Sequence, residues 1–192
     1  MRKDLFSKIK KKYSQVGSWA IWAEASNSDT SNIKIFDIKT NKDLLTTLHT
    51  RYIFVALNIS SPIDKARPFG NFHGGKRDFM LRDAVKGTPL WGAYMTDIIK
   101  FHPEVNSTAV LRYFNKNPQE LKSHFDHFKQ EITDLGTTEN TQVIALGVLA
   151  YKLLLKAKLS NKLFKLTHYS SPTLSKLAYQ QEVSSLLEKL EA

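Results

Sequence analysis

Three polar residues of the chain, Asn58, Asp97 and His168, each lie at or just after the end of an apolar run. An amide, a carboxyl and an imidazole donate or accept hydrogen bonds, and the last two can also exchange a proton. Such side chains can bind a polar ligand and act on it if they meet in one place. They are far apart along the chain, so only the fold can bring them together.

Four short apolar runs predict buried strands at 52–57, 92–99, 142–147 and 163–167. Helical patterns fall between and after them, at 76–86, twice within 106–135, at 148–158 and at 175–190. This alternation predicts an α/β fold, a three-layer α/β/α arrangement with a central four-stranded, mainly parallel sheet. Ligands bind beyond the carboxyl ends of the strands in such sheets, so we expect the three polar residues to meet at one rim.

Each candidate also has a purely structural interpretation. Asn58 can cap a turn, and His168 can be a partly buried histidine bonded to the backbone. The loop at 67–75, Arg-Pro-Phe-Gly-Asn-Phe-His-Gly-Gly, can be a packed surface loop. We favour a binding site, because residues from different strands converge on one rim and loops on a rigid scaffold commonly carry binding residues.

The length of 192 residues predicts a single domain over 1–192, since domains average roughly 150 residues. We expect residues 1–45 to form a basic helical and extended extension of it. Within that extension the patterns predict helices at 2–14 and 42–49 and a strand or extended arm at 33–38. The lysines of 2–14 are interpreted as a solvated helix face.

The formal net charge of +10 at pH 7 favours a polyanionic partner, most often nucleic acid. The absence of cysteine excludes a disulfide scaffold, a cysteine-ligated metal centre and a thiol nucleophile. No apolar run approaches the ~18 residues that span a bilayer. We therefore expect a cytoplasmic monomer with no membrane partner. His124 and His127 have a spacing that could bind a metal, but they lie in a strongly polar pattern, and we expect no metal.

Several segments resemble the uracil-DNA glycosylase superfamily, in matching order. Residues 56–60 (Ala-Leu-Asn-Ile-Ser) are similar to the first active-site motif of its mismatch-specific and single-strand-selective branches, and 68–71 (Pro-Phe-Gly-Asn) to the loop after it. Residues 94–100 are similar to a strand of the thermostable iron–sulfur branch. Residues 168–175 resemble the second active-site motif. The resemblance spans about residues 50 to 180 and implies a domain that extrudes a base from DNA and hydrolyses its glycosidic bond without a cofactor.

The resemblance also implies roles for individual residues. Asn58 would position the attacking water, and His168 would donate a hydrogen bond to the leaving base. The extruded base would stack on Phe69 and contact other side chains, namely Asn71, Asp97 and Ser60. The strand would be held by a third group of side chains: Ser170, Ser171, Leu174 as a wedge, Lys165 and Lys176.

This chain departs from the family pattern at several positions. Ala56 and Ile59 replace a Gly and a Pro of the first motif, and the second motif has one extra residue. Asp97 replaces an Asn, whose amide can both accept from N3–H of uracil and donate to its O4, whereas a carboxylate only accepts. Four explanations remain open: Asp97 faces away, it is protonated, the base has an exocyclic amino group, or uracil is no longer cleaved.

Residues 140–181 contain six lysines and no acidic residue, so we expect this segment to supply a DNA-facing rim. The leading hypothesis is a glycosylase that excises uracil or a related damaged base from single- or double-stranded DNA. A second hypothesis is a non-catalytic descendant that binds DNA or a nucleotide. A third is an α/β protein whose basic surface recruits a protein partner or an acidic surface.

Overall fold

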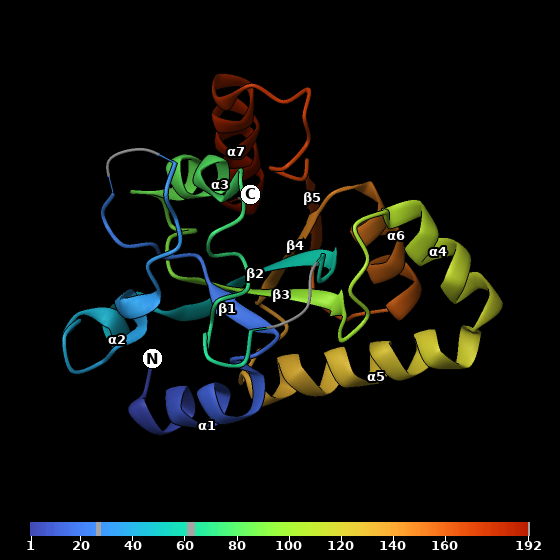
Figure 1. Cartoon of the computed structure of the whole chain (residues 1–192), viewed down its shortest axis with the longest axis horizontal. Coiled ribbons are helices and arrows are strands. Elements are labelled where there is room, and N and C mark those ends of the chain that lie inside the picture. The colour runs from blue at the N-terminus through green and yellow to red at the C-terminus, as the bar shows by residue number, and fades with distance from the viewer. Residues whose placement is uncertain (26–27, 61–63, 192) are drawn as a thin grey trace.

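Five strands form the sheet at the centre of the structure, a computed structural model that describes residues 1–25, 28–60 and 64–191 (Figure 1). The spatial order is β1-β3-β2-β4-β5, in which β3, β2, β4 and β5 run parallel and β1 runs antiparallel to β3. The bounds of the strands are β1 Gly17–Trp19, β2 His49–Asn58, β3 Ala93–Ile99, β4 Gln142–Leu146 and β5 Leu163–Leu166. The α/β class and the four predicted strands are confirmed.

The predicted number of strands was wrong by one, because β1 has only three residues and shows no periodicity. The strand is defined by its partner: Gly17 lies opposite Thr96 and Trp19 opposite Tyr94. A Cβ at Gly17 would overlap the Tyr94 hydroxyl, so glycine is required for this close approach.

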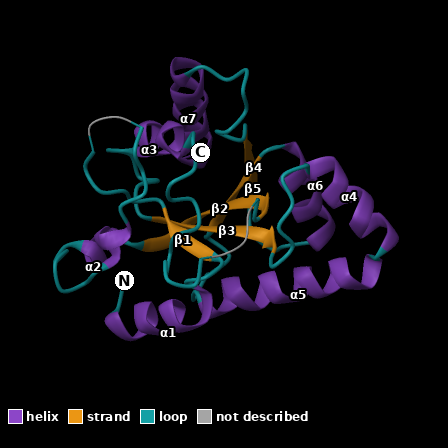
Figure 2. Cartoon of the chain, in the orientation of Figure 1, coloured by secondary structure: helices purple, strands orange, loops and turns teal. Residues whose placement is uncertain are grey.

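Helices cover both faces of the sheet, as Figure 2 shows. Along β2, Ile53, Val55 and Leu57 point into one hydrophobic cluster, and Tyr52, Phe54 and Ala56 into the other, as expected for a strand buried on both sides. The first cluster lies under α1 (Lys3–Tyr13), α4 (Ser107–Lys116), α5 (Pro118–Asp134) and α6 (Val148–Ala157). The second lies under α3 (Asp78–Val85) and α7 (Lys176–Glu191).

The N-terminal segment packs on the same core as the rest of the chain. Phe6 and Ile9 of α1 are buried in the first cluster, and Lys8, Lys12 and Tyr13 bind Asp134 at the end of α5. The arm predicted at 33–38 is instead a 3-10 helix, η1 (Ile33–Phe36), and the helix predicted at 42–49 is the single turn α2 (Leu44–Thr47), because β2 already begins at His49.

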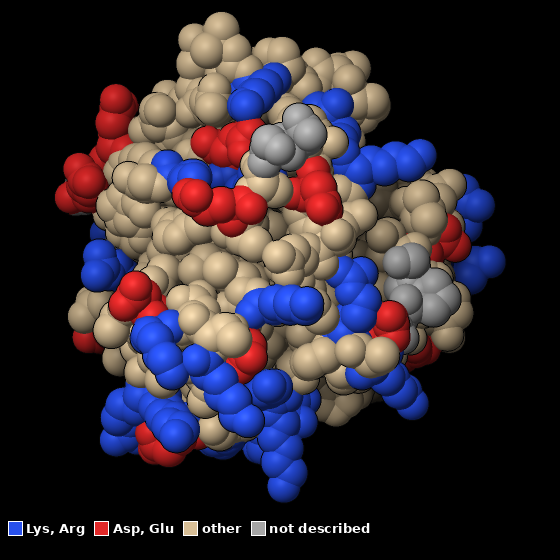
Figure 3. Space-filling model, turned by 60° about the vertical axis from the view of Figure 1, so that its left-hand side comes forward, with Lys and Arg blue, Asp and Glu red and all other residues tan. Residues whose placement is uncertain are grey.

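Basic side chains gather low on the face drawn in Figure 3, at the height at which α1 lies in Figure 1. The lysines of α1 outside the Asp134 contacts are exposed, as the solvated-face interpretation requires. None of the helices in the described part of the chain combines the length and apolar character needed to cross a lipid bilayer.

Candidate functional site

A cavity of about 600 Å³ opens at the carboxyl ends of the parallel strands, on the side that α3 and α7 cover. Its volume falls within the range of small-molecule sites, roughly 300–1,000 Å³. The structure brings together around it six of the residues singled out from the sequence: Asn58, Ser60, Asn71, Asp97, His168 and Ser170. They come from the ends of β2, β3 and β5 and from the loop before α3.

Asn58, the last residue of β2, connects the cavity to the loop after β3. Its Nδ2 donates to three backbone carbonyl oxygens, those of Ile59 (2.9 Å), His102 (3.2 Å) and Glu104 (2.8 Å). These bonds fix the orientation of the amide. Among contacts with described residues its Oδ1 accepts no hydrogen bond, so the amide oxygen remains as an acceptor for a water or a ligand.

Asp97 is 1 % exposed and nevertheless is among the residues that line the cavity. Its Oδ2 accepts from Nδ2 of Asn71 at 2.8 Å, and the same Nδ2 donates to the Val16 carbonyl oxygen at 3.0 Å. Burial raises the pKa of Asp97 to about 7, and the Asn71 hydrogen bond and nearby Lys100 only partly oppose this. Near neutral pH the carboxyl therefore occurs in both protonation states.

His168 is held in one tautomer by the turn that follows β5. Its Nδ1 accepts from the backbone N–H of Ser170 at 3.2 Å and lies 2.8 Å from the Ser170 hydroxyl. The proton of the neutral ring is consequently on Nε2, which can donate. Burial lowers the pKa of His168 to about 4, so the ring is neutral at physiological pH. It stacks on Tyr169, with ring centroids 4.6 Å apart.

A second carboxyl, missed from the sequence, organises the wall of the cavity nearest α3. Asp78, the first residue of α3, accepts from the backbone N–H of Gly75 at 2.7 Å and interacts with the Tyr169 hydroxyl. Burial raises its pKa to about 6. Arg77 donates to the carbonyl oxygens of Tyr169 (3.2 Å) and Leu174 (2.6 Å), which ties the loop after β5 to the start of α3. The only sequence signal was the position of Arg77 and Asp78 at a helix start.

The aromatic residue that lines the cavity is not the one that the sequence predicted to contact a base. Phe69 is 0 % exposed, packs against Phe6 and Phe36, and is not among the residues that line the cavity. Its backbone is fixed by Ser14, whose carbonyl oxygen accepts from N–H of Phe69 at 2.6 Å. The assignment of Phe69 is therefore corrected. Phe72, three residues later, lines the cavity instead.

Four of the residues expected to hold a DNA strand lie outside the cavity lining. Ser171 contacts Thr173, and Leu174 is partly buried against the second cluster. Lys176 pairs with Asp83 at 2.6 Å. Lys165 lines a separate groove of about 450 Å³ between α6 and α7, together with Tyr151 and Glu182.

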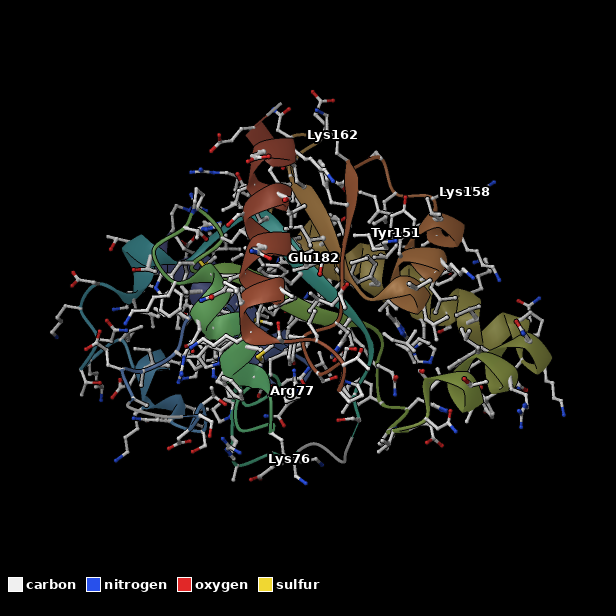
Figure 4. All side chains as sticks on the ribbon, turned by 90° about the horizontal axis from the view of Figure 1, so that it is seen from above. Lys76, Arg77, Tyr151, Lys158, Lys162 and Glu182 are labelled. Carbon is white, nitrogen blue, oxygen red and sulfur yellow. The ribbon has the colours of Figure 1, made fainter. Side chains whose placement is uncertain are left out.

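The lysines of 140–181 do not gather around the cavity. Lys158 ends α6 and Lys162 precedes β5, and Figure 4 shows both at the opposite end of the molecule from Lys76 and Arg77. The basic residues that line the cavity come instead from the segment between β2 and α3, namely Arg67, Lys76 and Arg77. The expected position of the basic rim was wrong, because the number of lysines in a segment of sequence does not show at which end of the sheet these lysines lie.

Comparison with models of known protein families found no match to this chain, and comparison with curated proteins found none either. Within residues 1–25, 28–60 and 64–191, no three His, Asp or Glu side chains lie close enough to hold a metal ion.

Proposed function

We propose that the protein is a DNA glycosylase-like hydrolase, which binds an extruded uracil or related base in the cavity and hydrolyses its N-glycosidic bond with water. The observation that carries the proposal is that an amide, a carboxyl and a neutral imidazole from three strand ends line one cavity. This reaction needs a positioned water, a donor to the departing base and a group that reads the base edge.

Asn58 supplies the acceptor for the water. Since its Nδ2 is bonded to three carbonyl oxygens, Oδ1 is held in a fixed direction and can accept from a water molecule. An amide does not remove a proton, so the reaction is slower than one assisted by a carboxylate base. Water attack then depends chiefly on stabilisation of the leaving base.

His168 supplies that stabilisation. Its Nε2–H can donate to the base oxygen next to the glycosidic nitrogen, where negative charge develops as the bond breaks. Ser170 holds the tautomer, and the pKa of about 4 keeps the ring neutral at pH 7. The hydrogen bond therefore does not require prior protonation of the ring.

Asp97 accounts for base recognition in its neutral form. A protonated carboxyl carries one donor and one acceptor, the same pair that an Asn amide offers to O4 and N3–H of uracil. With a pKa of about 7, this form is available at and below neutral pH. The ionised form only accepts, and it fits a base edge with an exocyclic amino group instead.

The experiment is a base-release assay on single- and double-stranded oligonucleotides that contain uracil, hypoxanthine or xanthine, followed by cleavage of abasic sites. We expect release by the unmodified protein, and a loss of about 10²- to 10³-fold in His168→Ala, the effect of removing one transition-state donor. Lys165→Ala is the matched control, because Lys165 lines the separate groove. No release from any oligonucleotide at stoichiometric protein would refute the enzymatic proposal.

A second candidate is the non-catalytic descendant that binds DNA or a nucleotide. The burial of Phe69 favours it, because the ring that the resemblance places against the base packs in the core. This candidate predicts oligonucleotide binding that weakens with salt and is accompanied by no base release. The same samples, analysed by gel shift and by cleavage, separate the two candidates.

A further inference from the structure

Two large apolar side chains are exposed on the loop between β3 and α4, residues 100–106. Phe101 is 72 % exposed and Val105 is 83 % exposed. Tyr113 on α4 is 40 % exposed and stacks near the ring of His102, with centroids 4.7 Å apart. The loop and α4 thus present aromatic and aliphatic surface together.

This exposure does not come from a loose loop, because the backbone is fastened on both sides of Phe101. Lys100 N–H donates to Nδ1 of His124 at 3.3 Å. Asn58 binds the carbonyl oxygens of His102 and Glu104, and Glu104 N–H donates to the Ile59 carbonyl oxygen at 3.2 Å. The loop therefore holds Phe101 in a defined place next to the end of β2.

The backbone of Phe101 is itself strained, with φ of 57°. A bulky residue in the left-handed region is energetically unfavourable, and such residues cluster at functional sites. Folding gains little from this ring, since most of it faces solvent. Strain together with exposure indicates that the ring acts on something outside the chain.

We propose that Phe101 is a stacking platform for a nucleobase that flanks the base in the cavity. The inference rests on the proposed function. Asn58 joins the two sites, since it lines the cavity and binds the loop at two carbonyl oxygens. The adjoining helix α4 carries exposed Arg112 and Lys116, which suit a phosphate backbone, and the acidic groups beside it are engaged within the protein: Glu104 accepts from Asn106 N–H and Glu120 from the Tyr113 hydroxyl.

A nucleic-acid strand fits this surface better than a second protein. Every base has a π-face, so an exposed aromatic ring holds a base without reading its sequence, and the exposed Arg112 and Lys116 of α4 can bind phosphates of the same strand. Val105 adds apolar contact to the same base or to its sugar. The cavity would then read one nucleotide, and the loop would position its neighbour.

The test measures affinity of the full chain for a fluorescently labelled single-stranded oligonucleotide that contains one uracil. We expect Phe101→Ala to weaken binding by about 5- to 100-fold, the effect of losing one base–aromatic stack. Phe101→Trp should retain the affinity. Leu155→Ala is the matched control, because Leu155 is 54 % exposed on the last turn of α6, at the amino end of the neighbouring strand β5, and should leave binding unchanged.

A 2-aminopurine placed beside the uracil reports stacking directly. Because extrusion of the uracil unstacks its neighbour in both complexes, the fluorescence should be lower in the complex with the unmodified protein, where Phe101 stacks on the 2-aminopurine, than in the complex with Phe101→Ala. Equal affinities for Phe101→Ala and the unmodified protein would overturn the inference while the proposed function stands. Loss of affinity without any base release would support the platform and refute the glycosylase. An unmodified protein that binds no oligonucleotide would overturn both.

Discussion

Two buried carboxyl groups flank strand β3 from opposite faces and are held in different ways. Glu131 of α5 is 0 % exposed and Asp97 of β3 is 1 % exposed. Glu131 accepts from the hydroxyls of Tyr94 (2.7 Å) and Thr96 (2.9 Å), and its Oε2 lies 2.6 Å from the Lys100 ammonium. Its charge is compensated within the protein.

Asp97 has one side-chain donor, the amide of Asn71, and no ammonium or guanidinium bound to its carboxyl in the described structure. The Lys100 ammonium instead donates to the backbone carbonyl oxygen of Asp97 and forms its ion pair with Glu131. Burial therefore raises the pKa of Asp97 to about 7. The contrast teaches that Glu131 serves the fold, whereas the Asp97 carboxyl has no counter-charge bound to it among the described residues and lines a cavity in which a ligand can contact it.

The largest effect should come from breaking the compensated pair. Glu131→Ala leaves the buried Lys100 ammonium without its counter-charge, with hydrogen bonds only to the Thr96 hydroxyl and the Asp97 carbonyl oxygen, and we expect a loss of about 3–5 kcal/mol in the free energy of unfolding. Urea denaturation measures it. The double variant Lys100→Met, Glu131→Met should recover much of the loss, and a single variant within about 1 kcal/mol of the unmodified protein would contradict a compensated pair.

Asp97→Asn should instead increase the free energy of unfolding. Because the folded pKa of about 7 lies above the ordinary value of 3.8, the stability that the neutral carboxyl contributes is complete below pH 3.8 and lost as the pH rises through about 7. The variant removes this titration, so its free energy of unfolding should exceed that of the unmodified protein at high pH by up to about 4 kcal/mol. The two proteins should differ less near pH 4. A difference that does not change with pH would contradict the assignment.

A smaller effect, on the pKa of Asp97, should distinguish the surroundings of Asp97 from those of Glu131 on the opposite face of β3. The Asn71 amide lowers the pKa of Asp97, so Asn71→Leu should raise that pKa further, by about one unit. Thr96→Val is the control on the Glu131 side, and it should cost about 1 kcal/mol of stability without moving the pKa. NMR titration of the Asp97 carboxyl measures both. An equal shift in the two variants would contradict the separation.

The strands β2 to β5 could be predicted from the sequence because each contains a local apolar run, although β5 is not the buried strand expected: Lys165 is exposed and only Leu166 is buried. β1 could not, since three residues become a strand only by pairing with β3. Asn58, Asp97 and His168 were predicted together because parallel strands end at the same edge. The sequence could not predict that Phe72 rather than Phe69 lines the cavity. Both residues have left-handed φ, and contacts with residues distant in the sequence decide which ring packs in the core.

The most direct test of the central claim is the pH dependence of uracil release from an oligonucleotide, measured in single turnovers from about pH 5 to about pH 9. If neutral Asp97 reads the base, the rate of the unmodified protein should fall as the pH rises through about 7, and Asp97→Asn should lose this dependence. Parallel profiles for the two proteins, or release by neither, would contradict the account.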